Sequence, residues 1–173
     1  MIIRFDERAV PNLGRISVAV AHVQGCAVVL AIGFSDDHDT PAIDHWLTTG
    51  AQRTNEPDQL HDQVFHALDR YAAGQPLPAL PVSIRHLSAF THLVLSATAA
   101  VPFGATRTYG EIAQTIGKPG AARAIGQALG RNPVPILIPC HRVTGTNSLG
   151  GFTPGVTIKR NLLAIEGVTF PRR

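Results

Sequence analysis

The chain has 173 residues, of which 45% are hydrophobic and 16% are charged, and its formal net charge at pH 7 is +3. This composition excludes a disordered chain and predicts one globular domain or two small ones, with a charge that permits nucleic-acid binding without requiring it. The two cysteines exclude the disulfide framework of small secreted proteins. No signal-like segment opens the chain and no apolar run reaches about 18 residues. We therefore expect a cytoplasmic protein that does not cross a membrane.

The N-terminal part of the chain predicts a small antiparallel sheet followed by a helix. Residues 2–5 are apolar, residues 15–21 alternate, and residues 26–32 form a continuous apolar run. These patterns are typical of strands, and Gln24-Gly25 indicates a hairpin turn between the second and the third. Apolar positions at helical spacing predict a helix over 56–73.

Residues 35–55 are polar and predict a loop. Within it, Asp36-Asp37-His38-Asp39 carries side chains that can ligate metals, but these residues lack the ordered spacing of a structural zinc site. A solvated loop is the commoner role of such a cluster. We therefore expect no bound metal.

A linker and a change of pattern predict two domains. Residues 74–81 contain glycine and several prolines, and residues 82–84 have the pattern of a last short strand. We place the domains at residues 1–85 and 86–173 and assign the chain to the α+β class.

Helices dominate the second predicted domain. Apolar patterns indicate helices over 87–100 and 156–166, and two shorter helices over 109–116 and 121–129. Because a short glycine-containing turn joins the shorter two, they match a helix-turn-helix. The second of these carries mostly alanine and glycine, which fits either close packing against a neighbour or entry into a narrow groove.

Residues 132–143, Asn-Pro-Val-Pro-Ile-Leu-Ile-Pro-Cys-His-Arg-Val, combine a rigid backbone with a lone thiol. Residues 136–138 predict a buried strand that ends just before Cys140. A thiol is only a few per cent ionised at neutral pH unless a base or a cation assists it. His141 is adjacent, and Glu166 in the last predicted helix is a candidate to orient it, which would complete a Cys–His–Glu relay.

The residues alone leave three interpretations of Cys140. It is a buried structural cysteine, a catalytic nucleophile, or a metal ligand. The metal-ligand interpretation is the weakest, because the other cysteine, Cys26, lies far away in the chain.

The motifs around Cys140 resemble those of one known family. Pro-Cys-His-Arg-Val at 139–143 follows Asn132-Pro133 and the predicted helix-turn-helix, and matching segments extend from Val101 to Gly167. In this order they resemble the O6-alkylguanine-DNA alkyltransferases, or methylated-DNA–protein-cysteine methyltransferases. The resemblance implies a ribonuclease H-like N-terminal α/β domain, and a mostly helical C-terminal domain that binds DNA and accepts an alkyl group.

The resemblance also implies chemical roles around the cysteine. Cys140 would take the alkyl group from guanine O6 by in-line displacement and keep it, so each molecule would act once. His141 would act as the base through a water molecule, with Glu166 as its partner. Asn132 would tie the turn to the active-site backbone, and Tyr109 would donate to guanine N3 and neutralise the leaving base.

For DNA, the resemblance implies that Arg123 enters the duplex in place of a flipped nucleotide. The helix-turn-helix would bind double-stranded DNA in the minor groove through Thr108, Ala121, Ala122, Gly126 and Gln127. The flipped base would contact the Val143 carbonyl, the Thr153 amide and Pro135. Candidate phosphate contacts are Arg107, Lys118, Arg131 and Lys159.

The chain also departs from the family pattern. Its first C-terminal helix reads Phe90-Thr91-His92 where the family usually has Phe-Gln followed by an aromatic residue. Phe152 stands where a tyrosine is usual, and Pro154 follows it. The pattern implies neither a cofactor nor a zinc site.

The expected activity is an irreversible transfer from O6-alkylguanine to Cys140 of a monomeric protein, with O4-alkylthymine as a second candidate substrate. Two other classes stay open. A non-catalytic protein that binds and flags alkylated bases generally lacks the cysteine. A cysteine hydrolase would need motifs that do not occur upstream.

Overall fold

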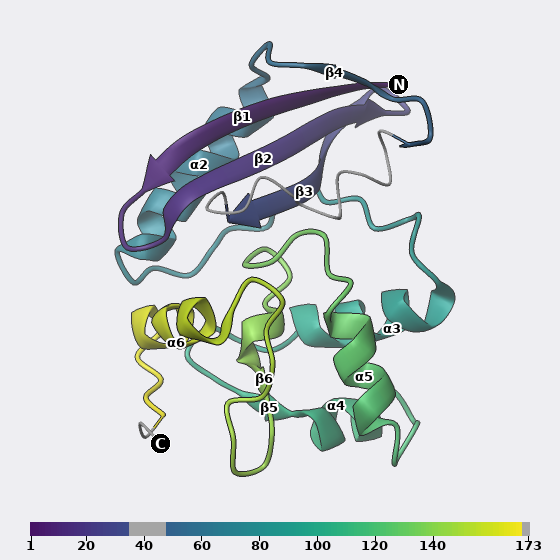
Figure 1. Cartoon of the computed structure of the whole chain (residues 1–173), viewed down its shortest axis with the longest axis vertical. Helices are drawn as coiled ribbons and strands as arrows, with labels where there is room; N and C mark the ends of the chain where they lie inside the picture. The colour runs from purple at the N-terminus through teal and green to yellow at the C-terminus, as the bar shows by residue number, and fades with distance from the viewer. Residues whose placement is uncertain (35–47, 171–173) are drawn as a thin grey trace. The chain divides into compact units, whose positions relative to one another are not determined.

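The structure is a computed structural model that describes residues 1–34 and 48–170 (Figure 1). Contacts divide the chain into two compact units, Met1–Ile84 and Arg85–Arg173. The acidic cluster at 36–39 lies outside the described residues. Within them, no helix is both long and apolar enough to cross a membrane, and no group of histidine, cysteine and carboxylate side chains is arranged to hold a metal ion.

The described part of the N-terminal unit consists of a four-stranded sheet and helix α2, Gln59–Ala72 (Figure 1). The strand order is β3-β2-β1-β4, with β2 antiparallel to both of its neighbours. The strands are β1 Ile2–Val10, β2 Gly14–Val23, β3 Cys26–Phe34 and β4 Gln52–Thr54. Helix α2 contacts the three long strands and buries its apolar side. Part of the core of this unit therefore lies between α2 and the sheet, and a second buried cluster, which includes Ile3, Phe5 and Ala21, lies on the other face of the sheet.

The three predicted strands are confirmed, and each is longer than its apolar segment. The turn between β2 and β3 consists of Gln24 and Gly25, whose φ angles are 54° and 82°. Two successive positive φ angles are typical of a two-residue type I′ hairpin turn. The predicted hairpin is therefore confirmed.

The sheet is mixed, so the prediction of a purely antiparallel sheet is wrong. β4 pairs with β1 in parallel, with Gln52 opposite Ile2. The three residues of β4 are polar and too few to show an alternating pattern. The strand predicted over 82–84 is reduced to an isolated bridge to Val29, next to Pro81, which has no N–H with which to extend a ladder.

Helix α2 begins at Gln59 instead of residue 56 because Asp58 caps it. The Asp58 carboxylate accepts from the Leu60 amide, and the Asp58 amide donates to the His61 ring. This reciprocal pair is a capping box, which satisfies donors that a helix start leaves without partners. The predicted helix is confirmed in type and in its buried face.

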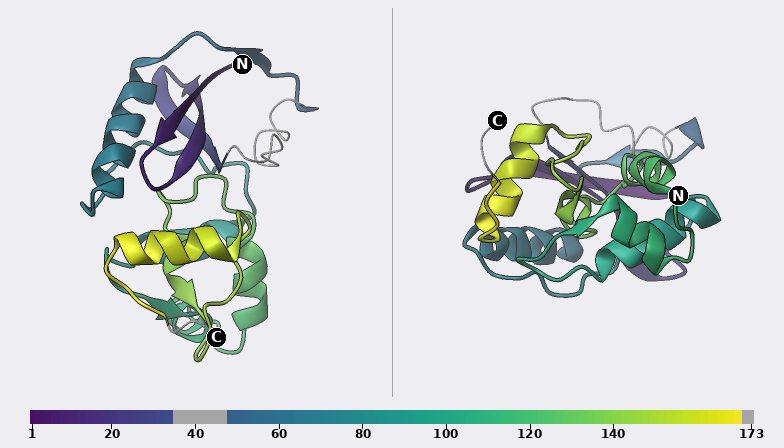
Figure 2. Two further views of the ribbon diagram at one scale, coloured as in Figure 1. Left: turned by 60° about the vertical axis from the view of Figure 1, so that its left-hand side comes forward. Right: turned by 90° about the horizontal axis from the view of Figure 1, so that it is seen from below.

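The C-terminal unit is mostly helical and contains a two-stranded parallel sheet (Figure 2). Its four predicted helices are confirmed close to their expected bounds. In chain order the elements are α3 Ala89–Ala99, β5 Arg107–Thr108, α4 Tyr109–Thr115, α5 Ala122–Leu129, β6 Val143–Thr144 and α6 Val156–Ile165. The fold class is α+β, as predicted.

Residues 136–138 form a tight turn, so the predicted strand is wrong. Ile136 has a φ of 73°, a left-handed conformation that is rare for a β-branched residue. The prolines at 133, 135 and 139 lack the N–H that a strand ladder requires. The predicted burial is confirmed for Ile136 and Ile138, which are both buried.

Candidate active site

Asn132 organises the turn that leads to the cysteine. Its Nδ2 donates to the Ile138 carbonyl at 2.8 Å and to the Cys140 sulfur at 3.0 Å. Its Oδ1 accepts from the Val134 amide at 3.1 Å. One side chain therefore supplies hydrogen bonds that the proline-rich backbone cannot make for itself, and it fixes the position of the sulfur.

Cys140 is the first residue of a short 3-10 helix, η1, Cys140–Arg142, which follows Pro139 directly. The residue is only 7% exposed. Burial raises the pKa of the thiol, and the Asn132 amide and the nearby Lys159 oppose this shift without cancelling it. The resting cysteine is therefore a protonated thiol at neutral pH and requires a base before it can attack.

His141 is completely buried, and its Nε2 lies 2.7 Å from Glu166 Oε1. Burial lowers the pKa of His141, and the Glu166 carboxylate opposes this shift. The imidazole is consequently neutral at pH 7 and can accept a proton. The Phe152 ring meets it edge-on, with ring centroids 6.4 Å apart.

Glu166 accepts hydrogen bonds from two other groups. Arg142 donates from Nε to Oε2 at 2.9 Å and from Nη2 to Oε1 at 3.0 Å. The Gly104 amide donates to Oε2 at 3.1 Å. These donors favour the ionised carboxylate, so the proton between His141 and Glu166 belongs to His141 Nε2. Nδ1 is then the basic nitrogen of the imidazole.

Arg142 and Gly104 connect Glu166 to the segment that follows α3. Arg142 Nη1 donates to the Val101 carbonyl at 2.6 Å, and its guanidinium lies 5.8 Å from the centroid of the Phe103 ring. Gly104 has a φ of 73°, and a Cβ there would lie 3.2 Å from the Glu166 carbonyl oxygen. Both observations require glycine at this position.

Lys159 is fully buried, so its prediction as a phosphate contact is wrong. Its Nζ donates to the Val143 carbonyl at 2.6 Å and to the Gly151 carbonyl at 3.2 Å. Burial lowers the pKa of Lys159 to about 8. Because its positive charge also favours the Cys140 thiolate, Lys159 belongs to the electrostatic surroundings of the sulfur.

Tyr109, the first residue of α4, lies against two glycines. A Cβ at Gly126 would lie 3.7 Å from Tyr109 Cε1, and a Cβ at Gly150 would lie 2.7 Å from its hydroxyl oxygen. Burial raises the pKa of Tyr109, the Gly151 amide that bonds to the hydroxyl lowers it, and Cys140 raises it further. The hydroxyl therefore keeps its proton at neutral pH and lies close enough to Cys140 for the two groups to interact.

Thr108 caps helix α4. Its hydroxyl accepts from the Glu111 amide at 3.1 Å, and the Glu111 carboxylate accepts from the Thr108 amide at 2.6 Å. The Thr108 hydroxyl oxygen therefore caps the helix, and the hydroxyl hydrogen can still donate to a ligand.

Helix α5 packs against α4 and has a surface of small side chains. Ala121 is its N-cap residue and supplies no side-chain hydrogen bond, so the first amides of the helix have no cap of that kind. Arg123 and Gln127 are exposed, whereas Ala122 and Gly126 are half-buried. The five predicted DNA contacts in this region therefore lie on α5 and its N-cap residue.

The other predicted contacts lie in the loops on either side of the cysteine. Thr153 is exposed, and its hydroxyl donates to the Gly130 carbonyl at 3.2 Å. Pro135 is buried within the turn before the cysteine, and the Val143 carbonyl already accepts from Lys159. Of the candidate phosphate contacts, Arg107, Lys118 and Arg131 are exposed.

Comparisons with known proteins agree with this geometry. Residues 89–168 match the family model described as "6-O-methylguanine DNA methyltransferase, DNA binding domain". The methylated-DNA–protein-cysteine methyltransferase of Methanosarcina acetivorans is 42% identical over 114 residues, which cover 65% of this chain and 72% of the relative. The chain belongs to the methylated-DNA–protein-cysteine methyltransferase family. The family predicted from the motifs is therefore confirmed.

Solved structures from this methyltransferase family share the fold. The O6-methylguanine methyltransferase of Mycobacterium tuberculosis superposes with a TM-score of 0.77 at 32% identity, over 95% of this chain and 92% of the other. Mycobacterium tuberculosis OGT in complex with DNA gives a TM-score of 0.74 at 30% identity, over 96% and 92%. Both units of the present chain thus have counterparts in one protein family.

The sequence alone does not reveal several residues of this methyltransferase site. Arg142, Gly104 and Lys159 act through contacts with residues far away in the chain, for which no local pattern exists. Gly150 is required by its φ of 71° and by its contact with Tyr109. A glycine-rich loop after the cysteine is the one local signal that could have indicated such a close approach.

Proposed function

We propose that this methyltransferase repairs double-stranded DNA by moving the alkyl group of O6-alkylguanine to the Cys140 sulfur, once per molecule. Membership of the family makes the protein a methylated-DNA–protein-cysteine methyltransferase, an enzyme of DNA repair. The observation that carries the proposal is a single cysteine held at 3.0 Å by Asn132, next to a histidine held at 2.7 Å by Glu166. O4-alkylthymine is a second candidate substrate.

The proposed reaction begins from a neutral thiol and a neutral imidazole. His141 Nδ1 takes the thiol proton through a water molecule, because Nε2 already donates to Glu166, whose negative charge stabilises the imidazolium. The thiolate attacks the alkyl carbon in line. The S–C bond forms as the C–O6 bond breaks, and the electron pair of that bond passes to guanine. The Asn132 amide and the charge of Lys159 both favour the thiolate.

Tyr109 is the proposed donor to the leaving base. Its hydroxyl accepts from the Gly151 amide, so the O–H can be directed at guanine N3 and neutralise the charge that develops there. The Val143 carbonyl, the Thr153 amide and Pro135 are proposed to line the base. The Val143 carbonyl can accept a second hydrogen bond in addition to the one from Lys159.

We assign the DNA contact to α4 and α5, as a helix-turn-helix that lies in the minor groove. A base within the stack cannot be attacked in line, so the nucleotide must be flipped, at a cost of a few kcal/mol. Arg123 is exposed on α5 and would fill the gap in the duplex. Small side chains on α5 permit its close approach, and the amides at its start suit a phosphate. Exposed Arg107, Lys118 and Arg131 would add salt-sensitive phosphate contacts.

For the whole chain, we propose that residues 86–173 form the DNA-binding and alkyl-transfer domain. Residues 1–85 would form a ribonuclease H-like domain, which the mixed sheet with its packed helix supports. The protein would act as a cytoplasmic monomer without a cofactor.

A mass-shift assay tests the proposal. After incubation with a duplex that carries O6-methylguanine, the Cys140 peptide should gain the mass of one methylene group, in a stoichiometric reaction. The Cys26→Ala variant should react like the wild type, and the Cys140→Ala variant should not react. Tight binding without transfer would indicate a non-catalytic lesion binder, and multiple turnovers of an ester would indicate a hydrolase. Methyl, ethyl and benzyl adducts compared side by side would define the range of alkyl size.

A second assay tests the role of Arg123. The Arg123→Ala variant should lose most of its activity on duplex DNA and little on the free modified base, because only the duplex requires flipping. Equal losses on the two substrates would contradict a flipping role.

A further inference from the structure

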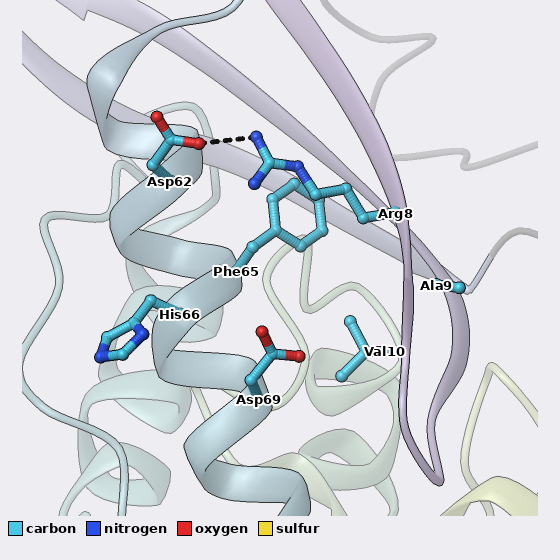
Figure 3. A pocket seen from close by; sticks show the side chains of 7 residues that line it. All are labelled: Arg8, Ala9, Val10, Asp62, Phe65, His66 and Asp69. Carbon is cyan, nitrogen blue, oxygen red and sulfur yellow. Dashed lines mark hydrogen bonds and ion pairs between the residues drawn. The ribbon is translucent and has the colours of Figure 1, made fainter.

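A crevice opens between β1 and α2 in the N-terminal unit (Figure 3). It has a volume of about 260 Å³ and is lined by residues 8–10 of β1 and by Asp62, Phe65, His66 and Asp69 of α2. Small-molecule sites usually occupy about 300–1,000 Å³, so this crevice suits one or two side chains better than a cofactor. None of its residues belongs to the candidate active site.

On the β1 side of the crevice, the described part of the chain places no strand beside residues 5–10. Within the described residues, β4 pairs with β1 only over 2–4, whereas β2 pairs with β1 to its end. The Gln52 amide of β4 donates to the Met1 carbonyl, so the odd-numbered residues of β1 direct their backbone polar groups toward the β4 side of the strand. By the same alternation, the N–H and C=O groups of Glu7 and Ala9 point out of the sheet.

A side-chain contact supports this orientation. The Asp6 carboxylate accepts from the Glu7 amide at 2.8 Å and from Arg8 Nε at 2.9 Å. If the Glu7 amide donated to a neighbouring strand, it would not be available to the Asp6 carboxylate. Local covering of this kind protects an edge strand from unwanted pairing. The next outward-facing residue, Ala9, carries only a methyl group and has no such cover in the described part of the chain.

The crevice is acidic although the whole chain carries a net charge of +3. Arg8 lies 2.7 Å from the carboxylates of both Asp6 and Asp62, and its guanidinium lies 4.7 Å from the Phe65 centroid. Asp69 adds a third carboxylate, which points from α2 toward β1 (Figure 3). With His66 neutral, the lining residues therefore carry one positive and two negative charges, a net charge of −1, and Asp6 adds a further negative charge beside them.

We propose that an extended basic segment of a partner protein binds here as an added strand along this edge of β1. Its backbone pairs with Ala9, an apolar side chain enters the crevice beside Val10, and a lysine or arginine pairs with Asp69. Strand addition of this kind takes its affinity from main-chain hydrogen bonds and its specificity from alternate side chains.

A second copy of this chain is a poorer occupant of the same edge. In a twofold antiparallel pair of strands, the residue on the axis lies opposite its own copy. An axis centred on the charged stretch 6–8 would place Asp6, Glu7 or Arg8 opposite the same residue, which is destabilising. An axis on Ala9 avoids this repulsion but pairs only residues 8–10, because β1 ends at Val10. A basic strand avoids this repulsion and complements the charge of α2.

A peptide titration tests the proposal with the full-length protein. The probe is a fluorescently labelled peptide of alternating lysine and valine, and the control peptide alternates glutamate and valine. We expect the lysine peptide to bind at least ten times more tightly than the glutamate peptide. We also expect Asp69→Lys to weaken the lysine peptide tenfold or more, whereas Glu56→Lys, an equal change of charge outside the crevice, should weaken it little.

Two further measurements separate strand addition from plain electrostatic attraction. Ala9→Pro removes an outward N–H, a change that edge strands tolerate, and it should weaken the peptide about as much as Asp69→Lys. Hydrogen exchange at the Ala9 amide should slow when the peptide binds. The proposal is overturned by absence of binding, by equal binding to the Ala9→Pro variant, or by equal effects of Asp69→Lys and Glu56→Lys. A protein dimer that Ala9→Pro disrupts would overturn it in favour of a second copy.

Discussion

Two arginines of this protein make similar contacts in different surroundings. Arg8 and Arg142 each pair with carboxylate groups, and each lies near a phenylalanine ring, at 4.7 and 5.8 Å from the centroid. The Arg8 side chain is 42% exposed, whereas that of Arg142 is 9% exposed. Water and ions compete for the exposed pair, and the buried pair has no such alternative. An arginine–carboxylate pair is therefore replaceable by water at the surface, whereas in the interior the stability of the fold depends on it.

Removal of the buried guanidinium should have the largest effect. Arg142→Met leaves Glu166 buried with fewer donors, and loss of one partner of a buried ion pair typically costs about 3–5 kcal/mol of unfolding free energy. Urea denaturation measures this loss. The exposed control Arg70→Met should change stability by no more than about 0.5 kcal/mol. If Arg142→Met unfolds at the same urea concentration as the wild type, the contrast between surface and interior does not hold.

Lys159 provides an intermediate case, a buried cation whose partners are carbonyl groups. Lys159→Met leaves the Val143 and Gly151 carbonyls without this donor, which should cost about 1–3 kcal/mol near neutral pH. The pKa of Lys159 is about 8 in the folded protein and 10.5 in its ordinary state, so the unfolded chain binds more protons between these values. The wild type should therefore gain stability relative to the variant as pH rises from about 8 to 10.5. Urea denaturation of both proteins across this range tests the sign, and a constant difference would contradict it.

The exposed arginine should contribute little. Arg8→Ala removes its pairs with Asp6 and Asp62, and exposed pairs of this kind are typically worth about 0.2–1 kcal/mol. A double-mutant cycle with Asp62→Ala measures the coupling, which should shrink at high salt. A coupling as large as that of the buried pair would remove the distinction between the two sites.

The smallest expected effect is a flat pH profile of alkyl transfer. Burial holds the pKa of His141 below its ordinary value of about 6.5, so the base is already neutral at that pH. Single-turnover rates on O6-methylguanine DNA should stay nearly constant from neutral pH to about 6.5 and decline only in more acidic solution. A tenfold decline before pH 6.5 would show that the imidazole is not shielded in this way.

Local patterns predict most of the fold. Helices α2 and α4 have side-chain caps and apolar faces, and the Gln24-Gly25 turn has the residue types that positive φ angles favour. Strand β4 was not predictable, because three polar residues carry no pattern and its pairing with β1 spans about fifty residues of chain. The strand predicted over residues 136–138 is wrong because apolar composition indicates burial and not backbone conformation.

The residues of the candidate site also divide into those that the sequence indicates and those that only the tertiary structure reveals. Cys140 and His141 are neighbours in the chain, and the family resemblance indicates Glu166 and Asn132. The Gly104 amide and the buried amine of Lys159 join the site only through tertiary contacts, across 62 and 16 residues respectively. A lysine in an amphipathic helix usually lies at the surface, so its burial could not be read from the sequence.

The hydrogen bonds of Asn132 also set a limit on changes of chain length. One amide nitrogen reaches both the Ile138 carbonyl and the Cys140 sulfur, six and eight residues further along. An inserted or deleted residue between Asn132 and Cys140 would separate the sulfur from this donor and move Ile136 out of its buried position. Surface loops elsewhere tolerate such changes at small cost. In this loop, unlike those, the number of residues matters as much as their identity.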